Sequence, residues 1–106
     1  MAQLKSVAAV SLIKGDTQVY EVPVDSPYIK LNELIIANTS SDQVTYVVRV
    51  FKSDIAQEVT IIANSILLAH ESKILPLSTC LNAGDKLIIN NNVNKAIDVL
   101  VSCVEM

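Results

Sequence analysis

The sequence predicts an all-β protein, a single antiparallel β-sandwich of Greek-key or jelly-roll type that occupies residues 1–106. Short runs rich in β-branched residues recur along the chain, and turn-forming residues interrupt them about every 8–12 residues. Hydrophobic residues make up 51% of the chain and aromatic residues only 4%, so Val, Ile and Leu would fill the core. No linker or low-complexity tract divides the chain, whose length supports one core.

The N-terminal part of the chain predicts a β-hairpin. Residues 6–13 form the first candidate strand, Lys14-Gly15-Asp16 is a turn, and residues 17–22 return as the partner strand. Residues 1–4, which precede the hairpin, are a candidate N-terminal arm. Leu34 to Ala37 is a later core run, and the turn formers Asn38-Thr39-Ser40-Ser41-Asp42 end it.

Residues 44–52, VTYVVRVFK, give the clearest strand pattern. Period-two alternation places two sets of side chains on opposite faces: Val44, Tyr46, Val48 and Val50 on one, and Thr45, Val47, Arg49 and Phe51 on the other. The first set is the better candidate for the core. Val47 and Phe51 leave the second face partly apolar, so that face is a candidate packing surface for a neighbouring chain.

Residues 53–70 are compatible with two structures. Ile55, Val59, Ile62 and Ile66 recur at helical spacing, and Asp54 with Gln57 resembles a capping box. The β-branched run Val59-Thr60-Ile61-Ile62 favours strands instead, and Asn64-Ser65 would compete with the backbone inside a helix. We therefore prefer two short strands, at about 58–63 and 66–69.

The C-terminal part of the chain predicts three strands. Residues 73–77 form a strand that runs on to Leu81, and 86–90 form the next one after the corner Asn82-Ala83-Gly84-Asp85. Gly84 would supply a positive φ at this corner, and Asn82 and Asp85 would bond the local backbone. Asn90-Asn91-Asn92 is a predicted polar turn. Residues 96–104 close the chain, with Ile97, Val99, Val101 and Cys103 on one face and Asp98, Leu100, Ser102 and Val104 on the other.

We expect no catalytic, cofactor-binding or metal-ligating residues. His70, the only histidine, would need a nucleophile beside it to act as a general base, and an enzyme would need a pocket around His70 and a cysteine. One histidine and two distant cysteines do not make a zinc site. Cys80 and Cys103 are predicted to be free, buried thiols, with a disulfide between them as the alternative. A glycine followed by Asp, at residues 15 and 84, is typical of a turn and not of a phosphate-binding loop.

The charge pattern argues against two classes of partner. The formal net charge is −3, and the eight Lys and Arg residues are scattered along the chain. Nucleic-acid-binding proteins carry clustered basic residues, so we expect no nucleic-acid partner. No segment contains about 18 consecutive apolar residues, so we expect no membrane partner either.

Four segments in order carry a resemblance to a known group of proteins. They are Glu33 to Ser41 (ELIIANTSS), Leu75 to Leu77 (LPL), Leu81 to Leu87 (LNAGDKL) and Val99 to Glu105 (VLVSCVE). Together they resemble small virion accessory proteins of tailed bacteriophages, which occur in the head, neck or tail. This resemblance implies a β-sandwich with strands through residues 53–70, no catalysis and no cofactor. The chain departs from the group in its cysteines and in its Asn-rich stretch near residue 90.

The predicted function is that of a non-enzymatic virion structural protein, specifically a capsid decoration or cement protein. We expect a homo-oligomer that contacts the major capsid protein or neck and tail proteins, located in a virion assembled in the host cytoplasm. The aliphatic excess of a small acidic domain supports an assembly role. The predicted interface, chosen for apolarity, consists of Met1, Ala2, Gln3, Leu4, Val47 and Phe51.

Two alternatives remain at the level of the sequence. The first is a neck, tail or baseplate component. The second is a small glycan-binding module for host attachment, which would need an exposed aromatic cluster drawn from Tyr20, Tyr28, Tyr46 and Phe51.

Overall fold

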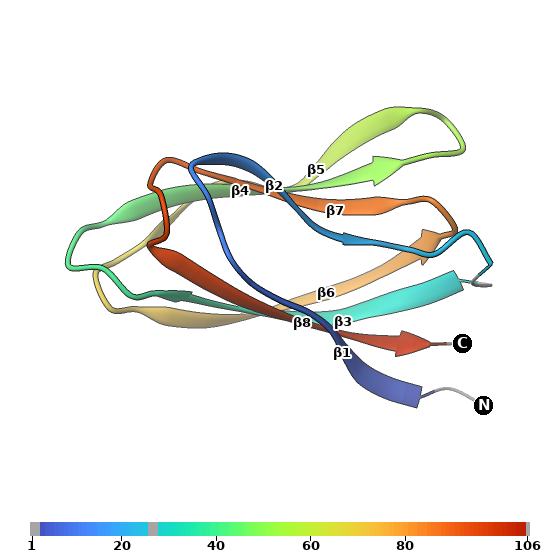
Figure 1. Ribbon diagram of the computed structural model, residues 1–106, viewed down its shortest axis with the longest axis horizontal. Helices are drawn as coiled ribbons and strands as arrows, with labels where there is room; N and C mark the ends of the chain where they lie inside the picture. The colour runs from blue at the N-terminus through green and yellow to red at the C-terminus, as the bar shows by residue number, and fades with distance from the viewer. Residues whose placement is uncertain (1–2, 26–27, 106) are drawn as a thin grey trace.

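The computed structural model describes residues 3–25 and 28–105, and all the regular secondary structure in these ranges is β (Figure 1). The strands are β1 (Gln3–Ser11), β2 (Gly15–Glu21), β3 (Tyr28–Asn38), β4 (Val44–Lys52), β5 (Gln57–Leu67), β6 (Ser72–Asn82), β7 (Lys86–Asn91) and β8 (Ile97–Glu105). The predicted all-β class is confirmed.

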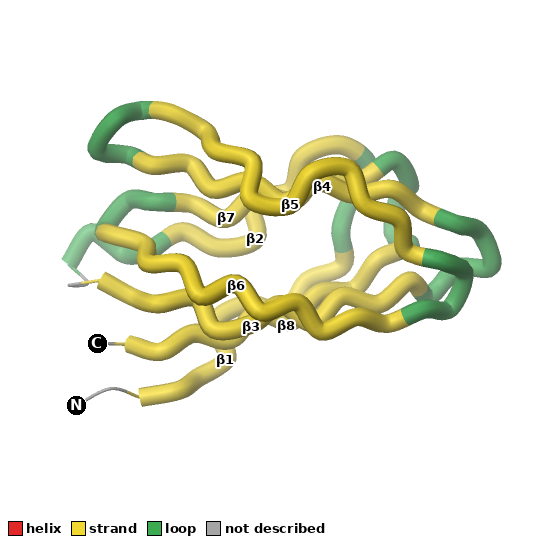
Figure 2. The backbone as a smooth tube through the Cα atoms, turned by 180° about the vertical axis from the view of Figure 1, so that it is seen from behind, coloured by secondary structure: helices red, strands yellow, loops and turns green. Residues whose placement is uncertain are grey.

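The strands form two four-stranded antiparallel sheets that pack face to face (Figures 1 and 2). We call them sheet A, in the order β1-β8-β3-β6, and sheet B, in the order β2-β7-β4-β5. The pairs β1–β8, β2–β7, β3–β6 and β4–β5 are nested one inside the other, as if one long hairpin had been rolled up. Eight strands in two sheets with this nesting form a jelly roll.

Alternating burial along the strands explains why the sheets pack as they do. In β4 the residues alternate between buried and half-buried, and Val44, Tyr46, Val48 and Val50 all lie in the core, as predicted. In β8 the residues from Ile97 to Cys103 alternate in the same way, and the predicted inner set is again buried. These two central strands therefore provide much of the hydrophobic contact between the sheets.

The predicted hairpin between the first two strands is wrong. β1 pairs with β8 in sheet A, whereas β2 pairs with β7 in sheet B. The connecting residue Leu12 is fully buried, and its N–H donates to the carbonyl oxygen of Ile97. Burying Leu12 between the sheets takes the chain from one sheet to the other. Gln3 and Leu4, predicted as part of an arm, lie in β1, and Met1 and Ala2 lie outside the described residues.

Residues 53–70 contain one long strand where two short ones were predicted, and the helical alternative is wrong. β5 continues through Asn64-Ser65 because register shifts against β4 accommodate these residues. Leu68 and Ala69, assigned to the second predicted strand, follow the end of β5. The tip of the β4–β5 hairpin lies away from the other loops of sheet B in Figure 1.

The predicted polar turn at residues 90–92 is only partly correct, because β7 runs through Asn90 and Asn91. Asn91 is buried, so its amide needs internal partners: it donates to the carbonyl oxygen of Ile13 at 2.7 Å and accepts from the N–H of Val93. Gly84 has a φ of +85°, as predicted for the corner.

Candidate functional site

The structure keeps the candidate catalytic residues apart. His70 is exposed in the turn between β5 and β6, with a φ of +58°. Cys80 lies toward the opposite end of β6, eight residues beyond Ser72, which is roughly 26 Å along an extended strand. Cys103 is buried in the core. His70 therefore has neither thiol within reach.

The two thiols differ in their surroundings. Neither Cys80 nor Cys103 forms a disulfide in the structure. Cys103 is buried as predicted, but the prediction that Cys80 is buried is wrong. Cys80 pairs in register with Lys30, an exposed residue on β3, and both face away from sheet B. Alternation along β6 sets this orientation, since the next residue, Leu81, points into the core.

The part of the chain that the structure describes contains no group of three or more His, Cys, Asp or Glu side chains arranged to hold a metal ion. Nor does it contain a helix with the length and hydropathy needed to span a membrane.

The aromatic residues do not all reach the surface. Tyr46 is only 2% exposed and belongs to the core, and Tyr20 packs against that core. Phe51 is half-buried, with the Lys86 ammonium 5.5 Å from the centre of its ring. The Tyr28 side chain lies outside those described. The glycan-binding alternative therefore loses Tyr46 as an exposed platform residue.

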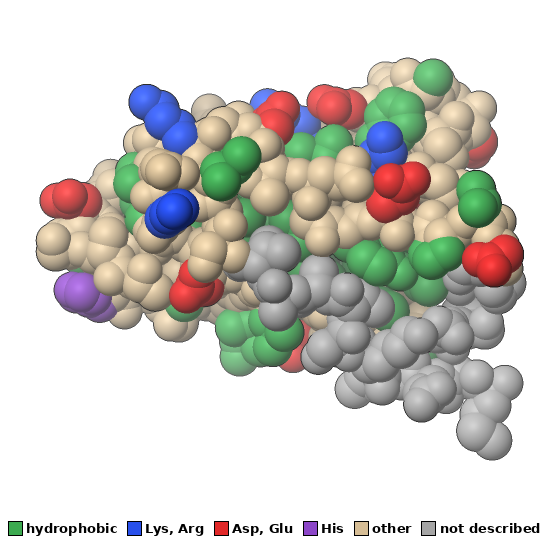
Figure 3. Space-filling model, in the orientation of Figure 1, with side chains coloured by type: hydrophobic (Ala, Val, Ile, Leu, Met, Phe, Trp, Pro, Cys, Tyr) green, Lys and Arg blue, Asp and Glu red, His purple; other side chains and the backbone are tan. Residues whose placement is uncertain are grey.

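The outer face of sheet B combines polar groups that pair with one another and apolar side chains, among them Ile66, which is 49% exposed. Arg49 forms an ion pair of 3.1 Å with Asp16, and the amide of Asn90 donates to the same carboxylate at 2.8 Å. The predicted interface residues Val47 and Phe51 lie on this face and are half-buried among these polar groups. Figure 3 looks across the sandwich, with sheet B above sheet A, and on this side of the molecule acidic, basic and apolar side chains are interspersed.

The outer face of sheet A carries a row of apolar side chains. Leu100 on β8 lies opposite Ile35 on β3, which in turn lies opposite Ile74 on β6. We call these three residues the apolar row. Ile74 is 64% exposed, Leu100 is 38% exposed, and Ile35 is half-buried. Aligned across three strands, they form a continuous strip of surface that has no hydrophobic covering within the described chain.

Mostly short side chains and two carboxylates flank the apolar row. On one side lie Asp98, Ala37 and Ser72, and on the other lie Ser102, Glu33 and Pro76. The apolar row therefore occupies the space between two more polar rows on the outer face of sheet A. This face is the strongest candidate for an interaction surface.

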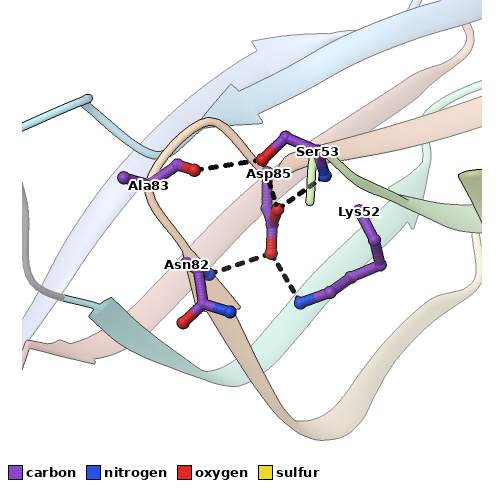
Figure 4. A network of polar contacts seen from close by, with 5 residues as sticks. All are labelled: Lys52, Ser53, Asn82, Ala83 and Asp85. Atoms are coloured by element: carbon purple, nitrogen blue, oxygen red, sulfur yellow. Dashed lines mark hydrogen bonds and ion pairs between the residues drawn. The ribbon is translucent and has the colours of Figure 1, made fainter. Parts of the chain in front are cut away.

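A buried carboxylate joins the β4–β5 hairpin to the corner between β6 and β7 (Figure 4). Asp85 is fully buried directly after Gly84, and the Lys52 ammonium contacts its Oδ2 at 2.6 Å. The N–H of Asn82 donates to Oδ2 at 2.9 Å, and the N–H of Ser53 donates to Oδ1 at 2.9 Å. The carboxylate therefore holds the turn of the β4–β5 hairpin against the β6–β7 corner.

Opposing effects set the pKa of Asp85. Burial raises the pKa of this carboxyl, but the Lys52 ammonium and the N–H groups of Asn82 and Ser53 lower it by stabilising the anion. The Ser53 hydroxyl, 3.1 Å from Oδ1, adds to this lowering. The net pKa lies below the ordinary value, so Asp85 is ionised at neutral pH and serves a structural role.

The interface predicted from the sequence does not include the apolar row. Ile35, Ile74 and Leu100 were each in a recognised strand or core run, and the alternation of residues 96–104 put Leu100 on the second face of its strand. What the sequence could not show was that these three residues align side by side, because that alignment depends on the pairing of β8, β3 and β6.

Comparison with known proteins supports the fold. A chain in the crystal structure of the T13 viral particle of IBDV matches with a TM-score of 0.63 and 10% sequence identity, over 98% of this chain and 31% of that one. A chain in the structure of infectious bursal disease virus Gx strain matches with a TM-score of 0.56 and 10% identity, over 98% and 32% of the two chains. This chain thus spans about a third of the length of each. At this identity the likeness shows a shared fold.

No protein-family model and no curated protein sequence matches this chain. The resemblance of four of its segments to tailed-phage virion proteins therefore stays a prediction, and what the comparisons add is a jelly-roll architecture shared with chains of viral particles.

Proposed function

We propose that this protein is a non-enzymatic structural component of a virion. The observation that carries the proposal is the fold: 98% of the chain aligns with part of a chain from a viral particle. Eight-stranded jelly rolls recur in viral capsid domains, and they also occur in lectin domains and cupins. A fold alone does not fix a function, so the surface must also suit assembly.

The apolar row on the outer face of sheet A supports an assembly role. Contiguous exposed apolar surface on a small domain is typical of a contact with another chain. The candidate catalytic residues give no competing explanation, since His70 and the two thiols lie apart.

The specific role that we propose is decoration or cementing of the head of a tailed bacteriophage. This step rests on the segments 33–41 and 81–87, which resemble proteins of that group. A neck, tail or baseplate position is the alternative within the same class. The two differ in copy number, because a decoration protein follows the head lattice and a neck or tail protein follows a single ring or tube.

The test is to locate and count the chain in purified particles of the virus whose genome carries this sequence. Quantitative mass spectrometry against the major capsid protein, with a reconstruction of the intact particle, gives both results. We expect a copy number on the scale of the major capsid protein and density on the outer head surface. A much smaller copy number, as expected for a single ring of subunits, would instead indicate a position in the neck or tail. Its absence from particles would overturn the virion proposal.

A further inference from the structure

We propose that the outer face of sheet A is a homodimer interface, in which two copies pack face to face about a two-fold axis. The inference rests on this surface alone and is independent of the virion role. Its starting point is the apolar row of Leu100, Ile35 and Ile74, which crosses three neighbouring strands. Hydrophobic side chains aligned in this way favour burial against a second flat surface.

The sheet edges are less suited to self-association than this face. The edge strand β6 carries Pro76, which lacks an N–H, and Lys73, which pairs in register with the inward-facing Ile36. The Lys73 ammonium donates to the carbonyl oxygen of Ile66 on β5 at 3.0 Å. Proline and inward-pointing charge are features that discourage the addition of a further strand.

The other three edge strands carry irregularities of their own. The register shifts between Ser6 and Ala8 in β1 and between Gln18 and Tyr20 in β2. The pairing of β5 with β4 contains two further shifts. Register shifts bend a strand and interrupt its row of hydrogen-bonding groups. A partner is therefore expected on the face of a sheet.

The charge distribution on this face suits a second copy of the same chain. Among the side chains that the structure describes there, the charged ones are Asp98 on β8 and Glu33 and Lys30 on β3. The Asp98 carboxylate already accepts a hydrogen bond from the Ser11 hydroxyl. These few charges leave the apolar row open to contact.

A two-fold axis parallel to the strands, between β8 and β3, sets β8 of one copy over β3 of the other. Because the register pairs Asp98 with Ala37, Glu33 with Ser102 and Lys30 with Val104, this rotation places each charge over an uncharged residue of the second copy. Leu100 then faces Ile35 of the second copy. No described like charges oppose each other, and apolar surface meets apolar surface, as an isologous interface requires.

The size of the molecule allows such an interface. Its principal extents are 41 × 28 × 18 Å. A sheet face running the length of this molecule offers an area on the order of the ~800 Å² per partner that standard interfaces bury.

The experiment is sedimentation equilibrium of the full chain at concentrations from about 1 to 100 µM. The wild type should shift from the 11.5 kDa monomer toward twice that mass. Ile74→Lys should weaken the dimer at least ~10-fold by placing a charge in the apolar row. Ile55→Lys is the matched control: Ile55 is 60% exposed, close to the 64% of Ile74, but it lies in the β4–β5 turn. This control should dimerise like the wild type.

Ile74→Thr provides a second variant that keeps the β-branched shape, and circular dichroism checks that each variant is folded. We expect the Ile74→Thr variant to weaken the dimer as well, because it replaces an apolar side chain of the apolar row by a polar one. A wild type that remains monomeric throughout, a trimer or larger assembly, or an Ile74→Lys variant that dimerises like the wild type would overturn the proposal. The proposal would also be overturned if Ile55→Lys weakened the dimer as much as Ile74→Lys does. None of these outcomes bears on whether the chain is found in particles, so this proposal and the virion role can fail separately.

Discussion

The outer faces of the two sheets are built from the same number of strands but use their side chains differently. On sheet B, Arg49 and Asn90 both donate to the Asp16 carboxylate, which joins side chains of three strands. On sheet A, the equivalent central position holds the apolar row of Leu100, Ile35 and Ile74. Polar groups that satisfy each other within the chain leave little for a partner to bind, whereas exposed aliphatic groups gain from being covered.

Sheet B also has a polar contact below its surface. Lys52, the last residue of β4, reaches the buried carboxylate of Asp85 beyond the end of β7. The surface ion pair and the buried one have different expected energies, because solvent screens the first and not the second. Sheet B thus stabilises the fold through polar contacts, whereas the outer face of sheet A is the surface that we propose for self-association. Four predictions test this division, from the largest effect to the smallest.

Asp85→Asn should destabilise the protein by about 3 kcal/mol. The variant removes the charge that faces Lys52 and places an amide donor where the Ser53 and Asn82 N–H groups donate. Urea denaturation followed by circular dichroism measures the free energy of unfolding. Asp54→Asn, in the exposed turn beside Ser53, is the control and should change that free energy by less than about 0.5 kcal/mol. Equal effects of the two variants would show that the buried network does not stabilise the contact between the β4–β5 turn and the β6–β7 corner.

The wild type should become less stable as the pH is lowered below about 4. The pKa of Asp85 is lower in the folded state, so its ionised form stabilises the protein above the unfolded pKa, and this contribution is lost as the pH falls through the folded pKa. The difference in unfolding free energy between the wild type and Asp85→Asn should therefore shrink as the pH falls from 7 to about 3. Urea melts at each pH measure it. A difference that stays constant would contradict the assignment.

A reciprocal pair of lysine substitutions compares the two faces directly. Leu100→Lys, on sheet A, should weaken self-association at least ~10-fold, because it places a charge in the apolar row. Val47→Lys, on the outer face of sheet B, should leave the dissociation constant within about threefold of the wild type. Sedimentation equilibrium measures both. The reverse pattern would restore Val47 and Phe51 as the interface and place the contact on sheet B.

Arg49→Ala should cost no more than about 1 kcal/mol of unfolding free energy. The Arg49–Asp16 pair is partly exposed, and the Asn90 amide still binds the Asp16 carboxylate after the substitution. A double-mutant cycle with Asp16→Ala, repeated at low and high salt, isolates the pair. A coupling energy above about 2 kcal/mol would show that the polar contacts of sheet B are worth more than an exposed pair.

Much of the fold could be predicted from the sequence because alternation is a local signal. The inner faces of residues 44–52 and 96–104 and the positive φ at Gly84 all followed from patterns within a few residues. The first hairpin could not be predicted correctly, since a Gly-Asp turn between two strands is the same local signal whether they pair or separate into two sheets. Burial of Leu12 decided it.

The site was less predictable than the fold. Asp85 appeared as a turn residue bonding its local backbone, and it does accept from the N–H of Asn82. Its contacts with Lys52 and Ser53 join residues 33 and 32 positions away, which no short-range pattern reports. Cys80 was expected in the core because Leu81 beside it is apolar, yet adjacent residues on a strand face opposite ways.

By itself, the sequence determined the β class, the places where strands turn, and which side of each central strand is apolar enough for the core. These properties depend on side-chain period and on the φ preferences of single residues. Only the tertiary structure decided which strands became neighbours, and therefore that Leu100, Ile35 and Ile74 form one row and that Asp85 meets Lys52. Strand pairing depends on the packing of the whole chain, so residues distant in sequence acquire a common surface only when both sheets have formed.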